Sequence, residues 1–178
     1  MKTFNLSTAL AVTMLVALVG NTVGGDDNRS RMKAGLNGSQ EVPTVFTMGS
    51  GVFQAKLDEA KTSIAFELSY EKLAGTASAA HIFFGQPGAN GAGPMITLCG
   101  GSKPACPASL PVTGTIAAAD ILAIPDQGIA AGNFDAALKA IRSGNAYVNV
   151  QSSIFPKGEI RGQIRGRHFG HFDDGDDD

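Results

Sequence analysis

Short runs of alternating apolar and polar residues follow one another along most of this chain. In residues 64–70, every second position carries a large apolar side chain, which is typical of a strand with one buried face. The polar residues 58–61 before this run are suited to a hairpin turn. Comparable runs predict further strands at residues 31–36, 51–57, 77–84, 95–98, 111–116, 146–152 and 159–165.

One segment has the spacing of a helix. In residues 134–142 the large apolar side chains recur three and four positions apart. Asn133 is suited to cap the start of a helix there, and Gly144 to end it. Many short strands with one short helix predict an all-β fold, either a β-sandwich or a Greek-key barrel.

The N-terminal segment, residues 1–25, is predicted to be a secretory signal peptide. Lys2 precedes an apolar run at residues 6–19, and small residues follow it. The run is shorter than the roughly 20 residues of a membrane-spanning helix; an N-terminal membrane anchor is the alternative. We expect an exported protein, periplasmic or secreted, with no membrane span after signal cleavage. Residues 26–32 would be a linker, 33–166 one domain, and 167–178 an acidic, flexible tail that contains histidine.

The formal net charge of −2 gives no broad basic surface, so no nucleic-acid partner is expected. Cys99 and Cys106 are the only cysteines, and they flank a loop rich in glycine and proline. In an exported protein they predict a disulfide. A metal or redox pair is the alternative, although their spacing fits neither Cys-x-x-Cys nor common zinc sites. Such a disulfide would stabilise the fold by roughly 2–3 kcal/mol.

Two predicted strands carry the polar residues most suited to a site. Because side chains alternate along a strand, His81 and Phe83 share one face of the first strand. Tyr147, Asn149 and Gln151 share one face of the second. A single histidine with an asparagine and a glutamine is a poor metal site. His81 could be a ligand or acid–base group, or a histidine hydrogen-bonded within the fold. Asn149 could line a pocket or bridge strand ends.

Three charged residues lie near the two ends of the predicted domain. Glu41, Glu159 and Arg161 could form a catalytic group. The structural alternative is an ion pair of Arg161 with Glu41 or Glu159, which would tie the first β-segment to the last, because arginine and carboxylate match as bidentate partners.

The tail is the best remaining candidate for metal binding. His168 and His171, with Asp173 and Asp174, could bind a divalent metal weakly. The alternative is a solubilising acidic tail that folds back over a patch formed by Arg161, Arg165 and Arg167.

Four blocks along the chain resemble the CHRD domain, the module named after chordin. They are LNGSQEVP at 36–43, AHI at 80–82 with the glycine-punctuated loop after it, YVNV at 147–150 and GEIRGQI at 158–164. The resemblance covers about residues 33–166. It implies an extracellular all-β sandwich, immunoglobulin-like or Cu-Zn superoxide dismutase-like and of Greek-key type, and it implies no established catalytic activity. This chain has Phe83 and Gln151 where the family pattern usually has histidine.

The sequence contains no Gly-x-Ser-x-Gly, His-Glu-x-x-His or phosphate-loop motif. We therefore expect a non-enzymatic binding or structural module without a cofactor. Its expected partner is an extracellular protein or a cell-surface component, met through the loops at 85–94 and 100–107, because binding residues concentrate on loops held by a rigid scaffold. The alternative is a metal-binding or metal-handling protein that uses His81 or the tail histidines.

Overall fold

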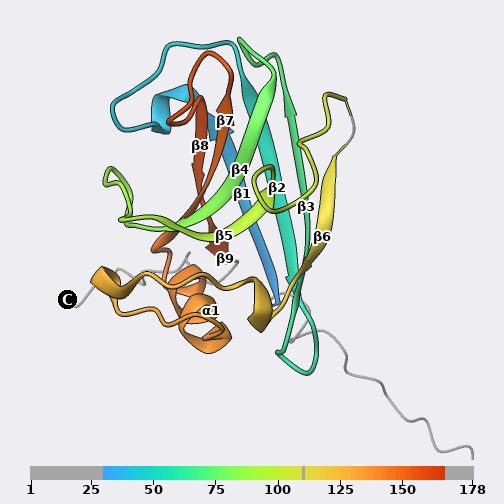
Figure 1. Cartoon of the computed structure of the whole chain (residues 1–178), viewed down its shortest axis with the longest axis vertical. Coiled ribbons are helices and arrows are strands. Elements are labelled where there is room, and N and C mark those ends of the chain that lie inside the picture. The colour runs from blue at the N-terminus through green and yellow to red at the C-terminus, as the bar shows by residue number, and fades with distance from the viewer. Residues whose placement is uncertain (1–29, 110, 167–178) are drawn as a thin grey trace, which may run out of the picture.

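A single curled sheet of antiparallel strands forms the body of the protein (Figure 1). The computed structural model describes residues 30–109 and 111–166. Along the sheet the order is β5-β4-β7-β8-β1-β2-β3-β6, and β9 pairs with β1. The strands are β1 Arg31–Asn37, β2 Ser50–Leu57, β3 Ile64–Glu71, β4 Ala77–Phe84, β5 Pro94–Cys99, β6 Val112–Ile116, β7 Ala146–Ser152, β8 Ile160–Gln163 and β9 Arg165–Gly166.

The sheet folds over on itself into two layers, and its edge strands β5 and β6 contact each other. The predicted all-β sandwich is therefore confirmed, in a form that approaches a closed barrel. Its strand order is compatible with a Greek-key arrangement. The sheet begins at Arg31, so β1 takes in the last two residues of the segment that the sequence assigned to a linker.

Alternation in the sequence becomes alternation in burial on one half of the sheet. Along β1, exposed and buried residues alternate without interruption. The apolar side of each strand faces the core between the layers, which includes Phe53, Leu68, Ile82 and Val148. On β7 and β8 almost every residue is buried. Both faces of these two strands are therefore covered.

The strand predicted at 159–165 is interrupted. Ile164 is fully buried, and its backbone N–H donates to the carbonyl of Ala146 at 2.8 Å. The residues on either side of it belong to different strands: β8 lies between β7 and β1, whereas β9 pairs with β1 alone. The prediction of one continuous strand was wrong at this residue.

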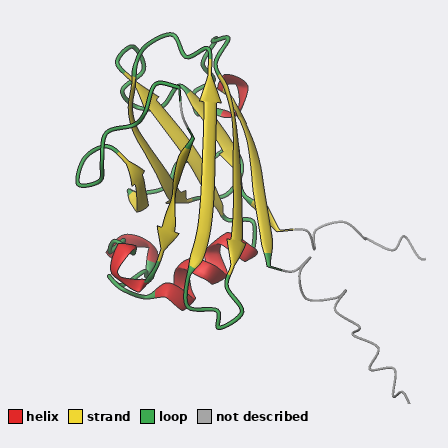
Figure 2. Ribbon diagram, turned by 90° about the vertical axis from the view of Figure 1, so that its right-hand side faces the viewer, coloured by secondary structure: helices red, strands yellow, loops and turns green. Residues whose placement is uncertain are grey.

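A helix closes one end of the sandwich (Figure 2). This helix, α1 Phe134–Arg142, confirms the sequence prediction: the side chain of Asn133 accepts a hydrogen bond from Ala136, and Gly144 follows with φ +74°. Its apolar side is buried in the core. No helix among the described residues is long and apolar enough to span a membrane. Within residues 30–109 and 111–166, the structure also has three short 3₁₀ helices that were not predicted, namely η1 Gly38–Gln40, η2 Ala118–Asp120 and η3 Pro125–Gln127.

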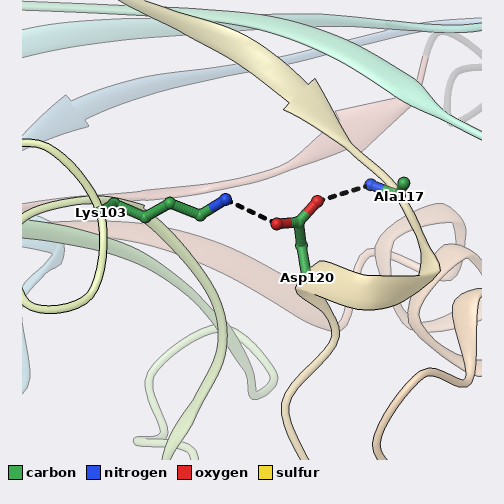
Figure 3. Close-up of polar contacts among 3 residues, drawn as sticks. All are labelled: Lys103, Ala117 and Asp120. Carbon is green, nitrogen blue, oxygen red and sulfur yellow. Dashed lines mark hydrogen bonds and ion pairs between the residues drawn. The ribbon is translucent and has the colours of Figure 1, made fainter.

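The loop between β5 and β6 is held at several points. The predicted disulfide joins Cys99 and Cys106, with their Cα atoms 5.1 Å apart. Figure 3 shows Lys103 in the same loop, whose Nζ lies 2.6 Å from Oδ1 of Asp120, while Oδ2 accepts from the N–H of Ala117 at 2.9 Å. This loop is therefore tied to the segment that follows β6.

Candidate functional site

A row of polar residues runs across four neighbouring strands. His81 on β4 lies opposite Asn149 on β7, which lies opposite Arg161 on β8, which lies opposite Asn37 on β1. Directly opposite residues of antiparallel strands point to the same face of the sheet. The structure therefore brings three of the predicted site residues together on one face.

This face points away from the apolar core. The alternating neighbours, such as Ile82 and Val148, are the residues that enter the core. Two chain segments, 38–45 and 85–91, cover the polar face and contact it through hydrogen bonds. We call the enclosed side chains the polar layer; its members are Glu41, His81, Tyr147, Asn149, Arg161 and Gln163.

Arg161 is the centre of the polar layer, and only 1% of its surface is exposed. Its Nη2 donates to the carbonyls of Gln86 at 3.1 Å and Ala89 at 2.8 Å, and its Nη1 donates to Oδ1 of Asn90 at 3.3 Å. The guanidinium carbon lies 3.5 Å from the ring centroid of Tyr147, a cation–π contact. Arg161 thus binds the inner side of the loop that follows β4.

The predicted ion pair between Arg161 and Glu41 or Glu159 is not formed. The donors of Arg161 are directed to the loop carbonyls instead. Burial lowers the pKa of Arg161, while Tyr147 and the charge of Glu41 raise it. Because arginine stays protonated in proteins, the carbonyl dipoles and the aromatic face compensate a buried cation without a direct ion pair.

Glu41 belongs to the covering segment 38–45, and its carboxyl group contacts the side chain of Asn149. The Nδ2 of Asn149 donates to both carboxyl oxygens of Glu41, at 2.9 and 3.1 Å. Burial raises the pKa of Glu41 to about 7, against the lowering effects of Arg161, Asn149 and the backbone of Val42. Gly158 makes this approach possible, because a Cβ there would collide with Asn149 and lie 2.7–2.8 Å from the carboxyl oxygens.

Glu159 lies elsewhere and ties three loops together. It is fully buried, and its Oε1 accepts from Oγ1 of Thr47 and from the N–H of Ala74, each at 2.6 Å. Burial alone would raise the pKa of Glu159, but hydrogen bonds, including those from Thr47 and Ala74, lower it. Its contacts are structural and do not belong to the polar layer.

Of the residues predicted for the site, His81 and Gln151 make the fewest contacts with the polar layer. The His81 ring is half-buried, meets Phe83 edge-on at 5.9 Å, and has a buried Nδ1 with no hydrogen-bond partner. Burial lowers the pKa of His81. Gln151 lies opposite Ala79, partly exposed.

Residues 30–109 and 111–166 contain no group of three or more His, Cys, Asp or Glu side chains placed to hold a metal ion. Cys99 and Cys106 are joined in the disulfide. The candidate tail ligands His168, His171, Asp173 and Asp174 lie outside the described residues.

Sequence reasoning did not identify Gln163 as a site residue, and it named Tyr147 only as a residue that shares a strand face with Asn149. Tyr147 carries the guanidinium of Arg161 on one face, and its ring stacks on Phe83 at 5.2 Å. Gln163 donates to the carbonyls of Gly85 and Gly144, both at 2.8 Å. Gln163 lies two residues after Arg161 in the same strand. This spacing places both side chains on one face, and it could have identified Gln163 from the sequence.

The fold and the polar layer define a small all-β sandwich module whose interior polar groups hold its own loops. The family model of the CHRD domain matches residues 32–164. The chain therefore belongs to the CHRD domain family, as the four sequence blocks indicated. No curated protein matches the chain, and no solved structure does. The family and the disulfide are consistent with an extracellular or periplasmic location.

Proposed function

We propose that this protein is a non-catalytic, exported binding module that presents the loop at residues 85–94 to a partner. The partner is an extracellular protein or a cell-surface component. In this proposal the N-terminal segment, residues 1–25, directs export of the protein, because it has the features of a signal peptide.

The observation that carries this proposal is the anchoring of the loop by Arg161. The guanidinium holds two carbonyls and one side chain of residues 86–90, and Gln163 holds the carbonyl of Gly85. The side chains of Gln86 and Pro87 nevertheless face solvent. A loop fixed from inside and exposed outside loses little conformational entropy on binding, which favours affinity.

The second loop, residues 100–107, is also braced but lies at the other end of β5 (Figure 1). The disulfide and the Lys103–Asp120 ion pair restrain it. The two loops therefore form separate surfaces. We assign the primary contact with the partner to the loop at 85–94, because the side chains of the polar layer hydrogen-bond to this loop.

The same contacts support a non-catalytic role. Catalysis needs polar groups directed at a substrate, whereas Arg161, Gln163 and the amide nitrogen of Asn149 donate to groups within the fold. The alternative function in metal handling would depend on His81 or the tail histidines, and residues 30–109 and 111–166 contain no group of three or more potential metal ligands that would support it.

A site-specific crosslink tests the proposal. A photoreactive amino acid replaces Gln86 in one variant and Lys139, an exposed residue of α1, in the control variant. Each is irradiated with the extracellular and envelope fractions of cells that produce the protein. We expect one discrete adduct from position 86, absent from position 139 and suppressed by excess unlabelled protein.

The partner identified in this way is then purified and its affinity is measured. Gln86→Ala should weaken binding about tenfold or more, while Lys139→Ala leaves it unchanged. Equal adducts from both positions, or equal affinities for both alanine variants, would contradict the proposal.

A further inference from the structure

Three loops meet at the end of the sandwich that lies opposite α1 (Figure 1). They are residues 38–49, 72–76 and 153–159, and we call the surface that they form the loop end. Oε1 of Glu159 binds the first two loops, through Thr47 and the N–H of Ala74. In the third loop, the N–H of Ser153 donates to the carbonyl of Thr76 at 2.9 Å. The three loops are therefore braced against one another.

Large apolar side chains project from the loop end into solvent. Phe46 is 98% exposed, Met48 76% and Ile154 59%. Ile154 lies against the middle loop, because a Cβ on Gly75 would come within 3.0 Å of its Cγ1. Among the residues that the structure describes, three of the five exposed large apolar side chains are therefore at this end.

The backbone fixes these side chains in their outward position. On one side of Phe46, the N–H of Val45 donates to a carbonyl of η1 at 2.9 Å. On the other side, the hydroxyl of Thr47 points inward and donates to Glu159 at 2.6 Å. Because side chains alternate along an extended segment, Phe46 and Met48 both point outward. The loop end thus has polar groups beneath and apolar groups on the outside.

Two lysines accompany the apolar side chains. Lys72 and Lys157 are exposed in the second and third loops. Glu71, at the end of β3, has its carboxylate 4.0 Å from the ammonium of Lys72, and both side chains are 66% exposed, so this pair is weak. These exposed groups, two ammonium groups and one carboxylate, give the loop end a net positive charge.

A lipid bilayer suits this surface better than a protein does. A stable protein interface buries about 800 Å² on each partner and fits it in shape, whereas the loop end offers a few separate side chains that project. A bilayer needs no matching pocket. It accepts apolar side chains about 5–10 Å deep at the boundary of the headgroups, and anionic headgroups attract nearby lysines.

We propose that the loop end docks on a lipid bilayer that contains anionic headgroups. Phe46, Met48 and Ile154 insert at the boundary of the acyl chains, while Lys72 and Lys157 contact the headgroups. The loop end includes residues 72–76, which precede β4, whereas the loop at 85–94 follows β4. The two surfaces are separate, so failure of lipid docking would leave the proposed function of the loop at 85–94 unaffected.

Tryptophan fluorescence tests this proposal, because the chain contains no tryptophan of its own. Phe46→Trp places a single reporter at the loop end. Leu122→Trp, at an exposed apolar residue after η2, is the matched control. The protein is purified from the producing cells as they process it, and thermal unfolding checks that both variants fold like the wild type.

The probe is a vesicle of phosphatidylcholine with about one third phosphatidylglycerol. On its addition, emission from Phe46→Trp should shift to shorter wavelength, and lipids brominated in their acyl chains should quench it. Emission from Leu122→Trp should change little. Met48→Ser with Ile154→Ser, in the Phe46→Trp protein, should raise the vesicle concentration for half-maximal quenching about tenfold or more. Leu122→Ser should leave that concentration unchanged.

Replacing both lysines tests the contribution of charge. Lys72→Gln with Lys157→Gln, in the Phe46→Trp protein, should raise the same concentration about tenfold on these vesicles. On vesicles of phosphatidylcholine alone, the lysine substitutions should have little effect.

Two results with vesicles would overturn the proposal: no quenching in Phe46→Trp, or equal quenching in the two reporter variants. A shift that appears without vesicles and grows with protein concentration would assign the loop end to a second copy of the chain. A shift produced by envelope proteins but not by protein-free vesicles would assign it to a protein partner. Either of these would also overturn lipid docking.

Discussion

Replacing Glu41 with glutamine removes a buried carboxyl group and keeps its shape. In the folded protein burial raises the pKa of Glu41 to about 7, from its ordinary value of 4.5. The folded state therefore favours the protonated acid. Stability that comes from this group is fully present below pH 4.5 and is lost as the pH rises to 7.

The expected magnitude follows from that difference in pKa. Each pKa unit corresponds to about 1.4 kcal/mol, so ionisation of Glu41 should cost about 3 kcal/mol of folding free energy by pH 8. Glutamine cannot ionise and still offers Asn149 an acceptor. Glu41→Gln should thus have nearly the stability of the wild type at pH 4, and exceed it by about 3 kcal/mol at pH 8.

Urea unfolding of both proteins at half-unit steps of pH measures this difference. Burial lowers the pKa of His81, so its contribution has the opposite sign, with stability rising as the pH rises toward 6.5. Since His81 is present in both proteins, its effect largely cancels in the difference. A stability difference that stays constant between pH 4 and pH 8 would refute the reasoning.

Three further variants test the fold around the loops. Gly158→Ala should destabilise by about 2–3 kcal/mol in urea unfolding, because the new Cβ collides with the polar layer at a backbone φ of +141°. Replacing Cys99 and Cys106 by serine should cost about 2–3 kcal/mol in thermal unfolding, because a short loop is no longer closed. Lys103→Met should cost no more than about 1 kcal/mol, decreasing with added salt, because the lysine is 38% exposed in its pair with Asp120.

Each of these predictions has a matched control. Gly35→Ala adds a Cβ that meets nothing within 4 Å, so equal losses at positions 35 and 158 would show that crowding is not the cause. Wild-type protein treated with a reductant should match the cysteine variant; an unchanged melting temperature would argue against the disulfide. Lys139→Met measures the cost of losing an exposed lysine, and Lys103→Met should exceed it.

The sequence predicted elements whose causes are local. The alternation in β3, the capping by Asn133 and the cysteine pair each depend on neighbouring residues, and each was confirmed. The break at Ile164 was not predicted, because it depends on a hydrogen bond to Ala146, which is distant in sequence.

The polar layer was predicted only in part for the same reason. Period-two spacing placed Asn149 on one face of its strand with Tyr147 and Gln151, but it could not show that His81 would pair opposite Asn149. Nor could it show which face a loop would cover. Two of the three hydrogen-bond acceptors of Arg161 are backbone carbonyls, which every residue has, so the sequence could not point to them and suggested a carboxylate partner instead. Only the fold brings the loop at 85–91 above it.

Hydrogen exchange in the variant Arg161→Lys tests most directly whether the polar layer holds the loop. Lysine keeps the charge but cannot bind both carbonyls in one plane. The amides of Ala89 and Gly91, which donate to Gln86 and Tyr147, should exchange about tenfold to a hundredfold faster, as expected for losing one charged hydrogen bond. The amide of Phe53 in the core should change much less. Equal acceleration at all these amides, or none at Ala89 and Gly91, would contradict the account.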